Sequence, residues 1–189
     1  MAKSFLSLLK HRRTISDFLP RPVPKAALDK ILDAGRWAPS FKNFQPWEFV
    51  VVKNKETIDK ILQQADYGFY RSHEHKFEPP LVVVLVLKKE YWEGQLGFPN
   101  RDKPGIFEAY ISMAMPALCM ALEAKEQGVA SSFLSVTDSE VLRLIGGREV
   151  DLVPLIICLG YEKPGLSAAR RRRKAIEQVV SYERCGCKK

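Results

Sequence analysis

Apolar residues recur along the chain with two different periods, which separate expected helices from expected strands. Between Pro24 and Pro39, apolar side chains follow the spacing of an amphipathic helix, at Ala27, Leu28, Ile31, Leu32, Ala34 and Trp37. The segment 81–87, LVVVLVL, is continuously apolar, as expected of a strand covered on both faces. The segment 106–127 predicts a long helix that is apolar nearly all round between Ile111 and Leu122, which is typical of a helix in a core or a subunit interface.

The rest of the chain continues this order of helices and strands. Further helices are expected over 4–10, 55–65 and 138–145, and further strands over 47–53, 129–134 and 153–159. Thr137 is the expected N-cap of the third of these helices, and Gly128 is the expected stop of the long helix. The segments 66–79 and 90–105 show no regular pattern. This order predicts an α+β or α/β fold with one sheet and helices on its faces.

Length and composition fit one globular domain. The chain has 189 residues, of which 46% are hydrophobic and 28% charged. We therefore expect a single domain over 1–189, with a basic arm and tail over 170–189. No apolar run approaches the ~20 residues that cross a bilayer, which argues against a membrane protein. Cys119 and Cys158 are expected in the core and Cys185 and Cys187 in an exposed tail, a pattern that fits a reduced cytoplasmic setting.

Positive charge is concentrated near the C-terminus. The net charge is +8, and much of it lies in the run RRRRK at 170–174, which predicts a local anion site. A second cationic stretch, HRRTISDF at 11–18, combines Arg12 with the hydroxyls of Thr14 and Ser16 on one side of an extended chain. Guanidinium and hydroxyl donors together suit a phosphate group. The rival interpretation is a nucleic-acid-binding module, because basic clusters also bind a phosphate backbone non-specifically.

The familiar side-chain chemistries are not evident. The chain lacks the G-x-G-x-x-G, P-loop and G-x-S-x-G patterns, and no pair of carboxylates suggests an acid–base couple. His73 and His75 alternate in a charged stretch that is typical of a solvated surface, so no metal is expected. We therefore expect the chemistry to reside in a bound cofactor. The stretch WAPSFKNFQPWEFVVV at 37–52 supports a binding role, because it holds more donors and acceptors than a simple turn requires.

The chain resembles the flavin-dependent nitroreductase family over residues 11–183. The resemblance is carried by RRTISDF, VPKAALDKILDAGRWAPSFKNFQPWEFVVV, EQGVASSFLS and RKAIEQVVSYE. Members of the family typically show R-R-S-x-R-x-F, a helix ending in A-x-x-A-P-S, then N-x-Q-P-W-x-F, and they close on R-K-P-L-E-E-V-V. The resemblance implies an α+β sandwich with a central, mostly antiparallel sheet, flanking helices and an extended C-terminal arm. It also implies a homodimer that binds flavin mononucleotide (FMN) at the subunit interface.

The resemblance also implies which residues bind FMN and what reaction follows. The implied set is Arg12, Arg13, Thr14 and Ser16 at the phosphate and ribityl chain; Pro39, Ser40 and Asn43 in a loop that meets the flavin, with Pro39 and Ser40 from the partner subunit; the backbone amide of Ser135 near flavin N5; and Arg171 and Arg173 reaching the phosphate from the C-terminal arm. NADH or NADPH would pass a hydride to the flavin. A nitroaromatic, a quinone or a similar acceptor would then be reduced by a ping-pong mechanism that needs no catalytic side chain.

Some positions depart from the family pattern. Ser16 occupies a position where the family usually has Arg or Lys, and Ala114 and Met115 replace a Gln-Asn pair. Ser131, Ser132 and Ser135 replace the glycine-rich character of the segment near the expected N5 position. These departures leave open a flavin-free scaffold of the same fold. Candidate residues for a substrate channel are aromatic, with a core or surface role as the alternative for each: Tyr67, Phe69, Tyr70, Trp92 and Phe98.

Overall fold

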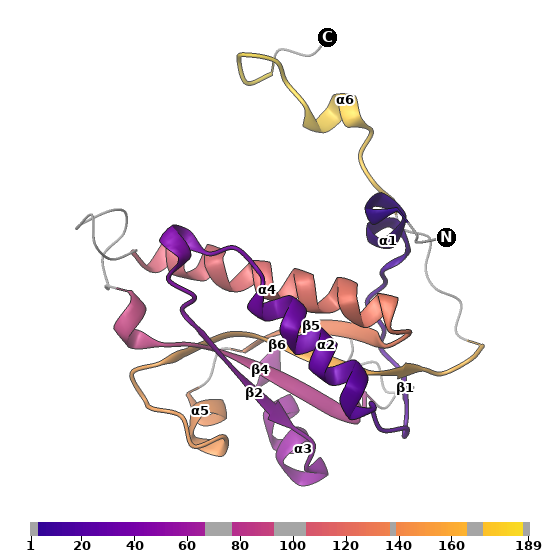
Figure 1. Ribbon diagram of the computed structural model, residues 1–189, viewed down its shortest axis with the longest axis vertical. Coiled ribbons are helices and arrows are strands. Elements are labelled where there is room, and N and C mark those ends of the chain that lie inside the picture. Colours follow the sequence, from indigo (N-terminus) through magenta and orange to yellow (C-terminus); the bar gives the residue numbers. More distant parts are fainter. Residues whose placement is uncertain (1–3, 67–76, 93–104, 137–138, 166–171, 187–189) are drawn as a thin grey trace.

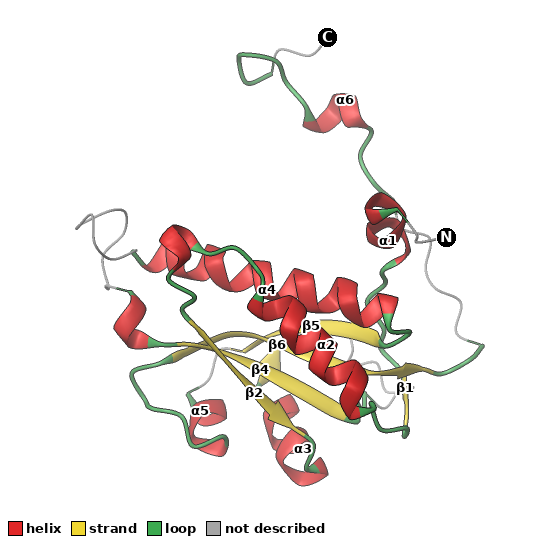
Figure 2. Cartoon of the chain, viewed as in Figure 1, coloured by secondary structure: helices red, strands yellow, loops and turns green. Residues whose placement is uncertain are grey.

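The computed structural model describes residues 4–66, 77–92, 105–136, 139–165 and 172–186. In this part of the chain, one sheet is flanked by helices on both faces (Figures 1 and 2). Its strands are β1 (Phe18–Leu19), β2 (Trp47–Val52), β3 (Ala65–Asp66), β4 (Leu81–Leu87), β5 (Ala130–Val136) and β6 (Leu152–Glu162). The helices are α1 (Phe5–His11), α2 (Lys25–Arg36), α3 (Lys55–Gln63), α4 (Ile106–Glu126), α5 (Glu140–Leu144) and α6 (Ile176–Val179), with 3-10 turns η1 (Phe41–Asn43) and η2 (Lys89–Tyr91).

The sheet is built from antiparallel pairs. Its strands follow the order β2-β4-β6-β5-β3, and β1 pairs with the end of β6. Every pair of named strands is antiparallel, while an isolated bridge between Thr14 and Ser131 is parallel. The fold is therefore α+β with a mostly antiparallel sheet, which confirms the expected fold class.

Strand β4 shows why the sheet is covered on both sides. All of its residues are buried. Val82, Val84 and Val86 belong to the core cluster that also contains residues of α3 and α5. The intervening residues Leu81, Val83, Leu85 and Leu87 belong to the cluster formed with α2 and α4. Because successive side chains of a strand point to opposite faces, the continuous apolar run follows directly from two cores.

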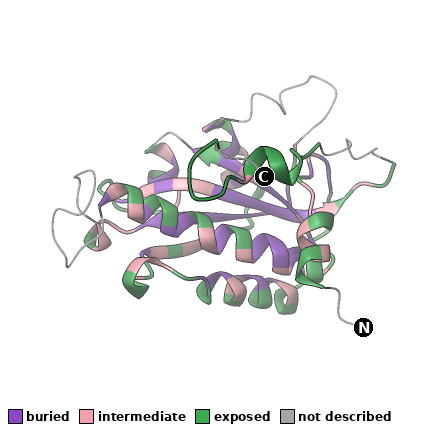
Figure 3. Ribbon diagram, turned by 90° about the horizontal axis from the view of Figure 1, so that it is seen from above, coloured by how far each residue is buried: buried purple, intermediate pink, exposed green. Residues whose placement is uncertain are grey.

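Helix α4 has one buried and one exposed apolar side. Met113 and Met120 are fully buried, whereas Phe107, Ile111 and Leu118 are exposed at 56%, 59% and 44%. Figure 3 shows exposed and buried residues alternating along the helices. By length and composition α4 could cross a membrane, but 44% of its apolar window is buried inside the protein, and core helices pass the same test. The expectation that this helix packs in the core is thus confirmed for its buried side, while an interface on its exposed side stays a prediction.

A fully buried carboxylate joins the ends of β4 and β6. Asp151 accepts hydrogen bonds from Arg148 Nη2 at 2.6 Å and from the Lys89 amide at 2.9 Å, and it pairs with Lys88 Nζ at 3.0 Å. Burial alone would raise the pKa of Asp151. The hydrogen bonds from Arg148, the Lys89 amide and Lys88 outweigh burial and lower the pKa to about 2.

The structure corrects several expected boundaries. Helix α5 is Glu140–Leu144, shorter than 138–145, and Ser139 occupies its N-cap position while Thr137 lies outside the described residues. Strand β6 is longer than 153–159, and β5 extends past residue 134. The two-residue strands β1 and β3 were not predicted. Two residues are too few to show a period, so these strands depend on tertiary pairing.

The C-terminal arm is extended, as the resemblance implied. In Figure 1, α6 lies beyond α1 and away from the sheet. Of the described residues 172–186, all are exposed except Val180. Cys185 is exposed and Cys158 is buried, as expected, whereas Cys119 is half-buried. Cys187 lies outside the described residues.

Candidate functional site

The segment after α1 is fixed along the start of β5. Helix α1 begins after Ser4, whose side chain accepts a hydrogen bond from the Ser7 amide, and the chain turns extended at Arg12. The Ile15 amide then donates to the Ser131 carbonyl at 3.2 Å, and the Ser132 hydroxyl donates to the Ile15 carbonyl. Burial of Ile15 in the core completes this attachment. The backbone on either side of Thr14 is therefore held beside the first residues of β5.

A cavity beside this segment is lined by cations from both ends of the chain. It has a volume of about 530 Å³, and its lining residues are Leu9, Lys10, Arg12, Arg13, Leu118 and Arg173. We call it the cationic cavity. Lys10, Arg12 and Arg13 come from the end of α1, and Arg173 comes from the arm. No acidic side chain is among these described lining residues, so the cavity favours an anion.

A smaller cavity adjoins the same arginines. It has a volume of about 90 Å³ and is lined by Arg12, Arg13, Ile15, Lys125, Gly128, Val129, Ala130, Ser131 and Glu162. The Arg12 guanidinium also lies 5.7 Å from the centre of the Phe133 ring, within the range of a cation–π contact. Arg12 is therefore positioned by β5 as well as by its own segment.

The cationic cavity contains only part of the phosphate set implied by the resemblance. Arg12, Arg13 and Arg173 line it, whereas Thr14 and Ser16 do not. Arg171 lies outside the described residues. Lys10 was missed, although its place next to His11, Arg12 and Arg13 in the sequence was a usable signal of local positive charge.

The segment 39–45 forms a tightly bonded loop between α2 and β2. The Ser40 hydroxyl accepts a hydrogen bond from the Gln45 amide at 2.9 Å, and the Phe41 amide donates to the Ser112 hydroxyl of α4 at 3.1 Å. Lys42, Asn43 and Gln45 all have positive φ angles, of 43°, 59° and 49°. Non-glycine residues adopt that region at an energetic cost, so the loop is held in one shape by these bonds.

This loop does not meet the cationic cavity within one chain. The loop contacts α4 at Ser112. The α4 residue that lines the cationic cavity is Leu118, and the α4 residue that lines the smaller cavity is Lys125. At the rise of an α-helix, Ser112 lies ~9 Å along α4 from Leu118 and ~20 Å from Lys125. Figure 1 shows α1 near one end of α4 and the chain that follows α2 near the other. Pro39, Ser40 and Asn43 are thus separated from Arg12 in a single protomer.

Ser135 lies at the opposite end of β5 from the bridge at Ser131. It is exposed and pairs with Leu155 of β6 and Asp66 of β3. At the rise of a β-strand, four residues separate the two positions by ~13 Å. Ser135, the residue predicted to face flavin N5, and the segment of Arg12, predicted to bind the phosphate, therefore lie at opposite ends of β5.

Most of the predicted substrate-channel residues, and the two alternating histidines, lie outside the described residues. Tyr67, Phe69, Tyr70 and Phe98 lie outside the described residues, as do His73 and His75. Trp92 is half-buried against the core beside α2 and α4, and Lys89 Nζ lies 4.0 Å from the centre of its ring. Trp92 thus has a structural role of its own.

Comparison with known proteins identifies the family. The model of the Nitroreductase family matches residues 9–161. The chain belongs to the nitroreductase family. This nitroreductase-family chain is 40% identical to "NADH dehydrogenase" from Thermus thermophilus over an alignment that covers 90% of it and 92% of that protein.

Solved structures agree with this assignment. The crystal structure of a nitroreductase family protein from Clostridium difficile is 26% identical, with a TM-score of 0.77 over 96% of this chain and 99% of that chain. A nitroreductase with bound FMN from Bacteroides fragilis shares the fold with a TM-score of 0.70 at 22% identity, over 92% of this chain and 96% of that chain.

Proposed function

We propose that this nitroreductase-family chain is an FMN-dependent oxidoreductase that uses NADH or NADPH to reduce a small organic acceptor, such as a nitroaromatic or a quinone. The observation that carries the proposal is the cationic cavity, to which both ends of the chain contribute. The name of the Thermus relative, NADH dehydrogenase, and the FMN bound in the Bacteroides structure support it. They support an oxidoreductase in general, while the acceptor and the nicotinamide rest on family resemblance.

The residues of the cationic cavity fit the phosphate of FMN. Three arginines and one lysine line a space that has no acidic side chain among its described lining residues. Arginine binds phosphate through paired, charge-assisted hydrogen bonds, and such contacts are the stronger kind in proteins. Arg12, Arg13 and Arg173, with Lys10, would hold the phosphate. The absence of a cation at Ser16 is offset by this lysine.

The division of the site between two regions of α4 supports a homodimer. The exposed apolar residues Phe107, Ile111 and Leu118 form a stripe on α4 that runs past the loop contact at Ser112, and Leu118 also lines the cationic cavity. Two copies of α4 packed antiparallel along this stripe would bring the loop of one chain toward the cationic cavity of the other. Pro39, Ser40 and Asn43 of one subunit and Arg12 of its partner would then share a site.

Within that site the protein supplies binding and orientation. Bound FMN would supply the hydride-accepting and electron-donating ring. The loop 39–45 is held in shape before any ligand arrives, which lowers the cost of ordering it on binding. Ser135 would present its backbone amide at the far end of β5 from the phosphate. We propose a ping-pong order, in which the nicotinamide leaves before the acceptor enters the same place.

The experiment is the visible absorption spectrum of the purified protein, before and after anaerobic addition of NADH and, separately, NADPH. The proposal expects a yellow protein whose flavin band is bleached by at least one nicotinamide and which releases FMN on denaturation. A colourless protein that does not take up added FMN would support the flavin-free scaffold instead. Nucleic-acid binding that weakens steeply in rising salt, without flavin, would favour the nucleic-acid-binding module.

A further inference from the structure

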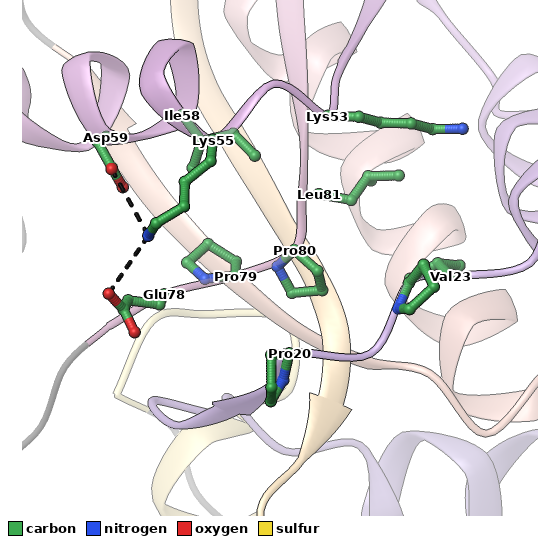
Figure 4. Close-up of a pocket in the computed structure, with 11 residues that line it drawn as sticks. Pro20, Val23, Lys53, Lys55, Ile58, Asp59, Glu78, Pro79, Pro80 and Leu81 are labelled. Atoms are coloured by element: carbon green, nitrogen blue, oxygen red, sulfur yellow. Dashed lines mark hydrogen bonds and ion pairs between the residues drawn. The ribbon is translucent and has the colours of Figure 1, made fainter.

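A third cavity lies at the junction of three connections, apart from the cationic cavity and the smaller cavity beside it. It has a volume of about 460 Å³ and is lined by Pro20, Pro22, Val23, Lys53, Lys55, Ile58, Asp59, Glu78, Pro79, Pro80 and Leu81 (Figure 4). We call it the proline cavity. These residues come from the β1–α2 connection, the β2–α3 connection with the first part of α3, and the entry to β4. The proline cavity and the cationic cavity share no lining residue.

The wall of the proline cavity is apolar and stiff. Val23, Ile58 and Leu81 are buried beneath it at 6%, 3% and 2% exposure. Four of the lining residues are prolines, whose rings fix the backbone and which have no amide proton. The wall therefore offers few hydrogen-bond donors, and polar recognition depends on the charged side chains at the rim. A volume of this size is typical of small-molecule sites.

One lysine of the rim is already neutralised. Lys55 Nζ lies 3.3 Å from Glu78 and 3.6 Å from Asp59. The hydrogen bond to Glu78 and the charge of Asp59 raise the pKa of Lys55 above its ordinary value. This bridge also ties the segment before β4 to the start of α3, which helps to fix the shape of the rim. A ligand amine at the two acids would have to displace Lys55.

The other lysine has an unused charge. In Figure 4, Lys53 extends in a different direction from Lys55, alongside Leu81. Its residue is exposed, and within the described part of the chain its ammonium group makes no hydrogen bond or ion pair. The cavity thus combines an apolar wall with one ammonium group that can bind an anionic group.

We propose that the proline cavity binds an aromatic monocarboxylate, with its rings against the prolines and its carboxylate at Lys53. Flat rings can lie against the rigid pyrrolidine faces and the apolar floor, while the ammonium group supplies a charge-assisted hydrogen bond. This inference does not depend on the proposed oxidoreductase function, because no residue of the cationic cavity takes part.

Chemical-shift mapping of the full ¹⁵N-labelled chain tests the proposal, with 2-naphthoate as the probe and 2-naphthalenemethanol as its neutral counterpart. The amides of Val23, Lys53, Ile58 and Leu81 should shift saturably with 2-naphthoate, with a Kd on the order of 0.1–1 mM for a ligand of this size. The neutral counterpart should bind at least about fivefold more weakly, because it lacks the charge that Lys53 neutralises.

Two variants test whether the charge of Lys53 is what binds the carboxylate. Lys53→Gln should weaken 2-naphthoate by about fivefold or more and leave the neutral probe unchanged. Lys60→Gln removes a cation of α3 that does not line the cavity, and it should change neither affinity. The proposal is overturned if the amides around the proline cavity do not shift, or if shifts appear only around Arg12 and Arg173. It is also overturned if Lys53→Gln binds 2-naphthoate as tightly as the wild type.

Discussion

Arg12 and Arg173 line one cavity, although they come from opposite ends of the chain. Arg12 is placed there by the bridge between Thr14 and Ser131, and Arg173 by the arm that follows β6. Cations that gather in one cavity repel each other, and an anion bound between them relieves that repulsion. The two arginines would therefore hold the phosphate of FMN between them.

The exposed stripe of α4 should carry the dimer interface. Ile111→Lys places a charge in the middle of that stripe, and a buried unpaired charge costs several kcal/mol. We expect the wild type to be a dimer by light scattering after size exclusion and the variant to be a monomer at the same concentration. Val150→Lys, at an equally exposed apolar residue away from α4, should remain dimeric. A monomeric wild type, or a dimeric Ile111→Lys variant, would contradict this prediction.

The buried Asp151 should be a large contributor to stability. Asp151→Asn leaves Lys88 and Arg148 without their shared carboxylate, and we expect the free energy of unfolding in urea to fall by about 3 kcal/mol at neutral pH. Asp33→Asn, at an exposed pair with Arg36, should cost at most about 1 kcal/mol. Equal losses for the two variants would refute the assignment.

Asp151 should also confer a specific pH dependence. Its pKa is lowered from 3.8 to about 2 in the folded protein, so its stabilising effect is complete above the unfolded pKa and is lost as the pH falls through the folded one. The difference in unfolding free energy between wild type and Asp151→Asn should therefore shrink by about 2 kcal/mol between pH 5 and pH 2. A difference that stays constant over this range would show that folding does not lower the pKa of Asp151.

Two glycines should tolerate an added methyl group to different extents. At Gly160, a Cβ atom would lie 2.7 Å from both Phe18 Cδ1 and Pro80 Cδ, so Gly160→Ala should destabilise the fold by about 1–3 kcal/mol. At Gly35, a Cβ atom would lie 2.3 Å from Met120 Cε, the flexible end of that side chain, and 2.9 Å from its Cγ, so Met120 must shift, while alanine favours the helix. Gly35→Ala should therefore destabilise the fold less than Gly160→Ala in thermal unfolding. The reverse order of the two stabilities would contradict this account of the packing.

The sequence was informative where a regular pattern was long enough. The run at β4 and the periodic residues of α2 and α4 predicted those elements, because the pattern arises from burial on two faces or on one side. The short strands β1 and β3 could not be predicted in this way, since their existence depends on pairing with β6 and β5.

The site was predictable only in part for a related reason. The residue types around Arg12 and Arg173 indicated phosphate binding, but no local pattern shows that the two segments line one cavity. The positive φ angles of Lys42, Asn43 and Gln45 could not be foreseen either, because the loop contains no glycine. Those conformations are imposed by tertiary bonds such as that between Phe41 and Ser112.

The affinity for FMN compared with riboflavin tests the central claim most directly, because riboflavin lacks only the phosphate. Binding is followed by flavin fluorescence for the wild type, Arg12→Ala and Arg173→Ala, with Arg21→Ala as the control, since Arg21 stacks on Tyr161 outside the cavity. We expect each of the two cavity variants to lose about 10- to 100-fold in FMN affinity and to keep the wild-type affinity for riboflavin. An unchanged preference for FMN over riboflavin in both cavity variants would contradict a phosphate site formed by the two ends of the chain.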